Sequence, residues 1–399
     1  MQPFTDDDGT KPFIPPLSVE ESESESTSER LLVPTGAPYS FVPPPFMLRP
    51  YEHDQPVIPD EADYESFDDE PSLCYILKMY RFRPRRGDWK HISSRGSSNA
   101  DDDPMVKPLP SSMRIITWNV DIIGNVTVRQ DRINKILRHL QEIIDSHDKR
   151  GGSERHRGDA VVVLLQEITP MMFNLIRTDE WVRRTFAIVP LREDKWPRQA
   201  CCGNVTLVSR DLEVVKAQIV HFRTTDAQRT GLLVYVQLSA TGKIEDKRTI
   251  CIANTHLESF PSGERKRARQ LEALAQLLKL DDNIEGGLIA GNMNPVGKMD
   301  CVLACNLGLD DAWQRGDSDP EGFTWGYQSS DEDKKHPPAR LDKILYVPKR
   351  RYSVDEPQRI GVGLKVVVTE QEQYWVSGHY GLLTSLHMDS SLKITNLDD

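Results

Sequence analysis

The pattern of hydrophobic and polar positions divides the chain near residue 112. After it, short apolar runs alternate with longer segments of helical periodicity, whereas the first 110 residues hold no long apolar periodic segment. Strands are expected at 114–121, 160–166, 185–189, 204–209, 213–221, 231–239, 249–256, 288–290, 343–347, 362–369 and 379–387. Helices are expected at 128–144, from Pro170 onward, at 263–280 and near 298–306. Many strands with helices between them predict two packed sheets with helices outside.

The stretch 286–294, GGLIAGNMN, combines a buried strand with polar groups at its end. The apolar run is short and bounded by glycine, and Gly291 is expected to let the chain turn where the strand ends. Asn292 and Asn294 are two residues apart, so they project to the same side if the extended geometry continues. This stretch therefore predicts a polar rim.

Polar residues recur where the expected strands end. One such residue is usually a cap or loop residue, but the recurrence at six strand ends predicts a shared site: Asn119 and Asp121, Glu167, Asn254, His256 and Glu258, Asn292 and Asn294, Asp342, and Ser377 with His379. Paired hard oxygens suit Mg²⁺, which takes few protein ligands and completes its shell with water and phosphate oxygens. A histidine backed by a carboxylate can stabilise charge on a phosphate.

The acidic character of the chain belongs to its first part. Residues 1–110 hold 21 acidic and 11 basic residues, a net charge of −10, against −11 for the whole chain. The remainder is therefore close to neutral, and the acidic pI does not exclude a nucleic-acid partner. Seventeen of the 27 prolines also precede residue 111. We expect a disordered acidic leader over 1–72, a strand or hairpin extension and linker over 73–111, a folded domain over 112–388 and a tail over 389–399.

The chain carries no pattern that predicts export or a membrane span. Its N-terminus has no basic segment followed by an apolar one, and no apolar run reaches the length of about 18 residues that a membrane helix needs. The six cysteines form no C-x-x-C pair. We interpret them as reduced core thiols of an intracellular protein, with a zinc site as the less favoured alternative.

The strand-end residues lie in motifs that resemble a known superfamily. In order along the chain they are TWNVD (117–121), LQE (165–167), NTHLES (254–259), GNMN (291–294), TW (324–325), RLD (340–342) and SGHYGL (377–382). As an ordered set they resemble the endonuclease/exonuclease/phosphatase superfamily and are most similar to its 5′-tyrosyl-DNA phosphodiesterase branch. The resemblance covers about residues 113–388. It implies an α+β fold, a four-layer α/β/β/α sandwich of two mostly antiparallel sheets flanked by helices.

The resemblance also implies Mg²⁺-dependent (or Mn²⁺-dependent) hydrolysis of a phosphodiester at a DNA 5′ end, by a monomer. It assigns Asp121 and Glu167 to the metal. It gives catalytic roles to Asn292, Asn294, His256 and His379, with Asp342 orienting His379. The substrate contacts that it implies are Asn119, Glu258, Ser259, Arg267 and Trp325, the last beside the substrate strand, where an aromatic ring can stack on a base. Arg265, Arg267 and Arg269 either face the DNA backbone or form a solvated helix face.

Two positions depart from the family motifs. The family's GDxN reads Gly291-Asn292-Met293-Asn294, and its SDH reads Ser377-Gly378-His379. An amide has nearly the shape of a carboxylate but accepts no proton at neutral pH. Because general-base help is worth about 10²–10⁴-fold, its loss predicts slower hydrolysis in an unchanged fold. The sequence places neither Asp300 nor Asp310, the two nearby carboxylates, as a substitute base.

Three functional interpretations follow from these residues. The first is a DNA-repair-type phosphodiesterase of reduced activity, located in the nucleus on the ground of its implied DNA substrate, with the cytoplasm as the alternative. The second is a catalytically impaired protein that binds DNA ends, protein-linked or free, or a protein partner. The third is a hydrolase of another phosphoester. Retention of Asp121 and Glu167 favours the first interpretation, and loss of carboxylates at 292 and 378 favours the second.

Overall fold

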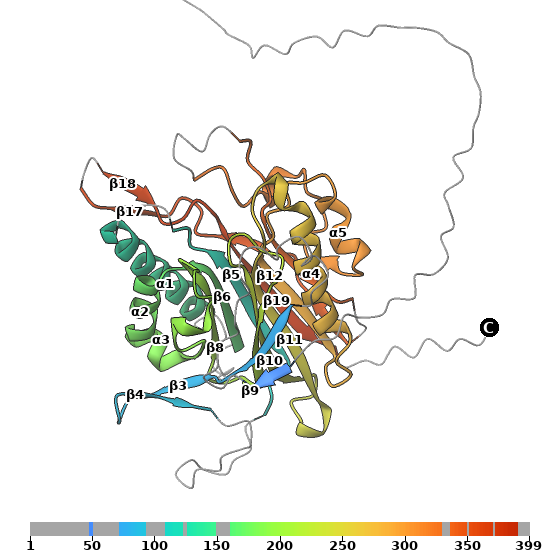
Figure 1. Cartoon of the computed structure of the whole chain (residues 1–399). Helices are drawn as coiled ribbons and strands as arrows, with labels where there is room; N and C mark the ends of the chain where they lie inside the picture. The colour runs from blue at the N-terminus through green and yellow to red at the C-terminus, as the bar shows by residue number, and fades with distance from the viewer. Residues whose placement is uncertain are drawn as a thin grey trace, which may run out of the picture. The chain divides into compact units, whose positions relative to one another are not determined.

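The computed structural model describes residues 48–50, 72–92, 108–122, 126–148, 160–328, 336–348, 351–369 and 372–389. Most of the predicted leader, the linker after residue 92 and nearly all of the predicted tail lie outside these residues. Within them, two large mixed sheets pack face to face, with helices on both outer faces (Figure 1). The α+β, four-layer α/β/β/α arrangement expected from the sequence is confirmed.

The first sheet has nine strands and carries the N-terminal half of the predicted site. Along the sheet the order is β15 (Tyr352–Val354), β19 (Gly381–Met388), β5 (Ser112–Asn119), β6 (Ala160–Ile168), β8 (Gly203–Ser209), β7 (Phe186–Val189), β3 (Tyr80–Arg83) and β4 (Asp88–His91), with β16 (Gln358–Ile360) also on β19. β5 and β6 run parallel, so both strands end at the same edge of the sheet. Its outer face is covered by α1 (Val126–Asp148), α2 (Pro170–Thr178) and α3 (Glu180–Thr185).

The second sheet has eight strands and carries the other half of the site. Its order is β1 (Leu48–Pro50), β2 (Leu73–Leu77), β9 (Glu213–His221), β10 (Thr230–Ser239), β11 (Lys247–His256), β12 (Gly286–Asn292), β14 (Asp342–Tyr346) and β13 (Asp310–Asp311). β11 and β12 are parallel and end together. Helices α4 (Glu264–Lys279) and α5 (Asp300–Asn306) lie on the outer side of this sheet (Figure 1).

Three apolar clusters fill the three interfaces between these four layers. Strand β6 shows why its run AVVVLLQ is not interrupted by polar residues. Val162 and Leu164 pack between the sheets, whereas Val161, Val163 and Leu165 pack under α1 and α2. A strand covered on both faces buries successive side chains on opposite sides, so it needs apolar residues at every position.

Most of the expected elements are confirmed, and the exceptions are short or irregular. The expected strand at 362–369 is reduced to β17 (Lys365–Val367), which pairs only with β18 (Gln373–Trp375) outside the two large sheets. Pattern reasoning did not predict α3, β1, β13, β15, β16 and β18, which have two to six residues each, and β1 lies within the expected disordered leader. Single 3₁₀ turns occur at Glu193–Lys195, Ile244–Asp246, Pro261–Gly263 and Pro320–Gly322.

Gly291 has a different role from the expected turn. Strand β12 continues through Asn292, and Gly291 lies inside it at φ +144°. A Cβ at this position would lie 1.8 Å from the backbone oxygen of Thr255 on the adjacent parallel strand. Glycine is therefore required by the close approach of β11 and β12, the two strands that end in His256 and Asn292.

The prediction of six core thiols holds for two of them. Cys74 and Cys251 are buried, whereas Cys201, Cys301 and Cys305 are exposed and Cys202 is half-buried. All six are free. The exposed thiols lie on the loop before β8 and on a helix face, where periodicity alone does not reveal which side meets solvent. No helix in the described part of the chain has the length and apolar character to cross a membrane.

Candidate active site

The strand ends that carry the predicted residues meet at one edge of the sandwich. Within the second sheet, His256 is opposite Asn292, and Asn292 is opposite Asp342. The two sheets are joined just beneath this edge by Gln166 and Asn254. Gln166 Nε2 donates to Asn254 Oδ1 (2.8 Å), and Asn254 Nδ2 donates to the backbone oxygens of Leu165 (3.2 Å) and Val205 (3.0 Å). Asn254 therefore fixes the two sheets to each other below the site.

Glu167 is held at the end of β6 by two donors from the first sheet. Asn119 Nδ2 donates to its Oε1 (3.0 Å) and the backbone N–H of Ile122 donates to its Oε2 (3.0 Å). Both Glu167 and Asp121 lie in the left-handed backbone region, at φ +59° and +58°. Such conformations cost about 1–3 kcal/mol each and cluster at functional sites. Asn119, predicted to contact substrate, is fully buried and orients Glu167.

Asp121 is engaged by the protein on its Oδ2 atom. The backbone N–H of Gly378 donates to it (3.2 Å), and the guanidinium of the buried Arg132 lies 3.5 Å away. A Cβ on Gly378 would lie 3.0 Å from the same oxygen. The glycine in the SGH motif thus brings the backbone directly onto the aspartate that the sequence assigns to the metal.

His379 and Asp342 form the predicted pair. His379 Nδ1 lies 2.7 Å from Asp342 Oδ2, which also accepts from Thr324 Oγ1 (2.7 Å). Thr324 Oγ1 accepts the backbone N–H of Asp342 in return (3.0 Å). Burial lowers the pKa of His379, but the Asp342 carboxylate, with Glu167 and Asp121 further away, outweighs burial and raises that pKa above its usual value. His379 is therefore held as a cation over a wider pH range than a free histidine.

His256 has the opposite electrostatic setting. Arg229 Nη1 donates to its Nδ1 (2.9 Å), so Nδ1 is an acceptor and the ring is neutral. Burial, the Arg229 cation and His379 lower the pKa of His256 well below its usual value. The proton of the neutral ring must then be on Nε2, which can donate to an oxyanion. Arg229 was not predicted from the sequence, because a single arginine before a strand belongs to no motif.

Asn294 and Ser259 extend the row of donors next to His256. Arg229 Nη2 donates to Ser259 Oγ (2.9 Å), and Asn294 Nδ2 donates to the oxygen of Leu257 (3.0 Å) and to Ser259 Oγ (3.3 Å). Asn292 Oδ1 accepts the backbone N–H of Asn294 (3.0 Å) and so holds the turn after β12. A shallow hollow opens beside His256 and is lined by Glu167, Cys202, Gln228, Arg229 and His256, among others.

Two predicted substrate contacts are structural residues instead. Glu258 Oε2 accepts from Thr225 Oγ1 (2.8 Å) and from the backbone N–H of Asp226 (2.9 Å), so it holds the loop before β10. Arg267 is 0% exposed and forms an ion pair with Asp300 at 2.7 Å. A buried guanidinium with its donors engaged has no access to a substrate, and this corrects the prediction for Arg267.

Neither nearby aspartate can replace the missing carboxylate at 292. Asp300 is committed to Arg267 and to the backbone N–H of Gly297 (2.6 Å). Asp310 is exposed on β13, paired in register with Tyr346 at the outer edge of the second sheet. Trp325, by contrast, lies at the site, because its backbone pairs with that of His379 and its Nε1 lies 3.9 Å from a Cβ built on Gly378.

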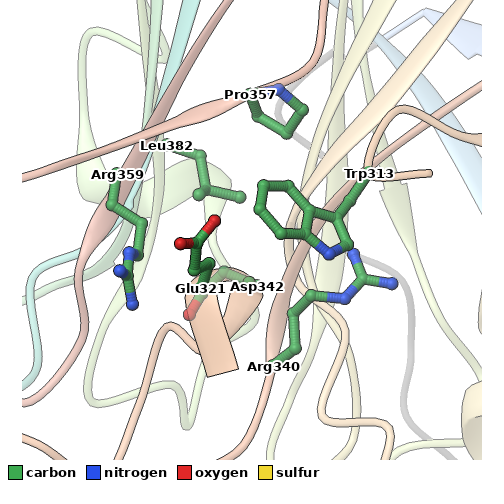
Figure 2. Close-up of a pocket in the computed structure, with 8 residues that line it drawn as sticks. Trp313, Glu321, Arg340, Asp342, Pro357, Arg359 and Leu382 are labelled. Carbon is green, nitrogen blue, oxygen red and sulfur yellow. The ribbon is translucent and has the colours of Figure 1, made fainter. Parts of the chain in front are cut away.

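Asp342 also lines a second hollow outside the row of donors. Figure 2 shows its other walls, which come from Trp313, Glu321, Arg340, Pro357, Arg359 and Leu382. Among the described residues, none forms a hydrogen bond with Asp342 Oδ1, although the residue is buried. Two charged side chains that line this hollow form ion pairs with other residues: Arg340 with Asp311 and Asp317, and Glu321 with Arg315. We assign no role to this hollow.

The donor set fits Mg²⁺ through one carboxylate. The described residues contain no group of three His, Cys, Asp or Glu side chains arranged to hold a metal ion. Mg²⁺ needs only one or two carboxylates, with waters and phosphate oxygens completing its shell. Glu167, oriented by Asn119 and at the edge of the hollow, supplies hard oxygen ligands of this kind. Asp121 is the second acidic group, with one oxygen shared with Gly378 and Arg132.

Comparisons with known proteins agree with this fold. No family model matches the chain. A structure of a D. rerio TDP2 humanized by 14 mutations matches with a TM-score of 0.50 and 19% identity, covering 69% of this chain and 99% of the other. D. rerio TDP2 in complex with a single-strand DNA product matches with a TM-score of 0.50 and 18% identity over the same shares of the two chains. This chain shares the fold of these TDP2 structures, so the resemblance predicted from the sequence is confirmed at the level of the fold.

A relative identified by sequence is a tyrosyl-DNA phosphodiesterase 2. The protein from Gallus gallus is 25% identical over 188 residues, which cover 46% of this chain and 42% of that protein. The chain thus spans less than half the length of this curated relative.

Proposed function

We propose that this chain is a Mg²⁺-dependent phosphodiesterase that hydrolyses a phosphodiester at a DNA 5′ end, with low turnover. The observation that carries the proposal is the convergence of Glu167, His256 and the His379–Asp342 pair at one edge where both sheets end. Desolvated, fixed donors and one positioned carboxylate are the elements that phosphoryl-transfer sites use.

The substrate class is inferred from relatives and from one aromatic residue. The relatives are named tyrosyl-DNA phosphodiesterases, and one was captured with a single-strand DNA product. Trp325 beside His379 gives this site a ring on which a terminal base can stack. We therefore propose DNA 5′ ends, free or protein-linked, as the partner, a monomer as the working unit and the nucleus as the location.

The protein's own groups would bind and orient the phosphodiester. His379, protonated and fixed through Asp342, donates to a phosphate oxygen or to the leaving oxygen. His256 Nε2–H, with the nearby Arg229 guanidinium, would stabilise the phosphate charge on the other side, and Asn294 positions Ser259 beside them. Mg²⁺, when bound at Glu167, supplies further positive charge for the phosphate oxygens.

Low turnover follows from Asn292. Its Oδ1 accepts from the backbone of Asn294, and an amide cannot take a proton from an attacking water. Because neither Asp300 nor Asp310 can take this place, the water attacks the phosphorus without general-base help. Restoring the carboxylate should therefore raise the rate by about 10²–10⁴-fold.

The test is Mg²⁺-dependent release of tyrosine from an oligonucleotide with a 5′-phosphotyrosyl group. We expect slow release by the native chain, much faster release by Asn292→Asp, and none by Glu167→Ala. Asn174→Asp, on the exposed face of α2, is the matched control and should leave the rate unchanged. Release by Glu167→Ala at the native rate would contradict the proposed site.

A second candidate function is binding of DNA ends without turnover. The specific support is that Asn292 and Gly378 stand where the family motifs have two carboxylates. Arg229, His256 and Asn294, the residues that would surround a phosphate, are present. The native chain would then bind a 5′-phosphorylated oligonucleotide but release no tyrosine at any Mg²⁺ concentration, and only Asn292→Asp would cleave. If neither protein cleaves or binds such oligonucleotides, the DNA assignment is wrong and other phosphoesters should be assayed.

A further inference from the structure

Phe260 is an exposed aromatic residue that directly follows Ser259 of the site. Its backbone has a conformation that is unfavourable for a bulky side chain. It is 76% exposed, more than any other large hydrophobic residue in the described part of the chain. Its φ is +63°, in the left-handed region where a bulky residue is an outlier. Both features cost free energy in the folded protein, because the ring stays in water and the backbone is strained.

The surrounding structure fixes Phe260 in this conformation. The backbone oxygen of Phe260 accepts from Arg267 Nη1 (2.7 Å) and from the backbone N–H of Gly263 (3.1 Å). Arg267 is fully buried and paired with Asp300. A Cβ on Gly263 would lie 2.9 Å from Glu258 Cγ, so the turn after Phe260 is also closely packed. A buried ion pair thus supports a segment whose outermost feature is one aromatic ring.

Phe260 is adjacent in sequence to the row of polar residues at the proposed phosphate site. It directly follows Ser259, whose hydroxyl accepts from Arg229 and from Asn294. On its other side begins α4, which has exposed guanidinium groups at Arg265 and Arg269 on its first two turns. Aromatic rings next to exposed cations, beside a phosphate site, are the arrangement by which proteins hold single-stranded nucleic acid.

We propose that Phe260 is a stacking platform for an unpaired nucleobase of a strand whose terminal phosphate occupies the His256–Asn294–Ser259 region. This inference rests on the proposed function for its ligand class and adds a second aromatic contact, separate from Trp325. The strained backbone presents the ring to the strand, and Arg265 and Arg269 face the adjoining phosphates.

The experiment measures binding of a 5′-phosphorylated single-stranded oligonucleotide, the reaction product, so that no turnover is needed. Phe260→Gly removes the ring and relieves the strain, because glycine adopts φ +63° without penalty. We expect the Kd to rise by between about 5-fold and 150-fold, the range of one base–aromatic stack, while the melting temperature stays equal or rises. Phe260→Trp should retain native affinity, and Leu280→Ala, which truncates an exposed apolar residue at the end of α4, is the matched control.

A second arm identifies the contacted base. Abasic sites are placed in turn at the first four nucleotides, and at one position the native chain and Phe260→Gly should bind equally well. Unchanged affinity of Phe260→Gly for every oligonucleotide overturns the inference. A loss seen only with a 5′-phosphotyrosyl oligonucleotide also overturns it, because the ring would then contact the leaving group. A native chain that binds the product but never hydrolyses substrate refutes the proposed enzyme activity and leaves the stacking result intact.

Discussion

At the scale of single residues, the site is defined by two positions where a carboxylate is missing, and the two are not equivalent. Asn292 keeps the shape of the lost group and holds the following turn through its Oδ1. Gly378 does not keep that shape. Its backbone N–H donates to Asp121 Oδ2, and a Cβ at this position would lie only 3.0 Å from the same oxygen. Restoring an acid is therefore expected to help at 292 and to create repulsion at 378.

Gly378→Asp should lower stability in the absence of divalent metal, by about 1–3 kcal/mol, because it places a second carboxylate against Asp121. Bound Mg²⁺ would offset that repulsion, so Mg²⁺ should raise the melting temperature of this variant more than that of the native chain. Gly378→Ala is the control for added volume alone. Equal Mg²⁺ responses of all three proteins would refute the predicted charge effect.

The His379–Asp342 pair predicts a pH dependence of known sign. The folded-state pKa of His379 is raised, so the stabilisation from its charged form is fully present below about pH 6.5, the unfolded value, and is lost as pH rises through the folded value. Asp342→Asn should lower that folded pKa and weaken this dependence. The titration of the His379 ring by NMR is the measurement. Asp355→Asn, which removes the partner of the exposed His387, should leave it unchanged.

At the scale of elements, α4 shows how one helix divides its basic residues between core and surface. Arg267 points inward to Asp300 and to the oxygens of Glu258 and Phe260, whereas Arg265 and Arg269 are exposed. The sequence ERKRAR does not distinguish these roles, because three arginines at two-residue spacing lie on different faces of a helix.

Arg267→Ala should destabilise the fold by about 3–5 kcal/mol, because Asp300 would be left as a buried, unpaired charge. Denaturant unfolding measures the change in the free energy of unfolding. Arg269→Ala, on the exposed side of the same helix, should change it by less than about 0.5 kcal/mol. Similar small effects of both variants would show that the Arg267–Asp300 pair does not hold the Phe260 turn.

At the scale of the whole molecule, a single short segment is shared by both sheets. β2 pairs with β9 of the second sheet, and the β3–β4 hairpin that follows pairs with β7 of the first. The sequence pattern of residues 73–92 predicted a strand or hairpin, but not that it would cover one edge of each sheet. Unpaired edges of this kind promote association between chains.

A chain that begins at residue 93 should therefore melt at a lower temperature and self-associate, since β7 loses its neighbour β3 and β9 loses its neighbour β2. A chain that begins at Pro44 is the matched control, because it retains every described element from β1 onward. Thermal unfolding and light scattering measure the two effects. A chain from residue 93 that is as stable and as monodisperse as the control would contradict this role for β2 to β4.

The sequence by itself determined most of the elements, the layer order and which polar residues stand at the strand ends. It did so because period-two and helical patterns record which faces are buried, and because TWNVD, LQE, NTHLES and RLD place polar residues where buried strands must end. The tertiary structure alone decided how those residues are used. The partners of Arg229, Arg267, Glu258 and Gly378 come from segments distant in sequence, and a side chain's charge state and access to substrate depend on such partners and on burial.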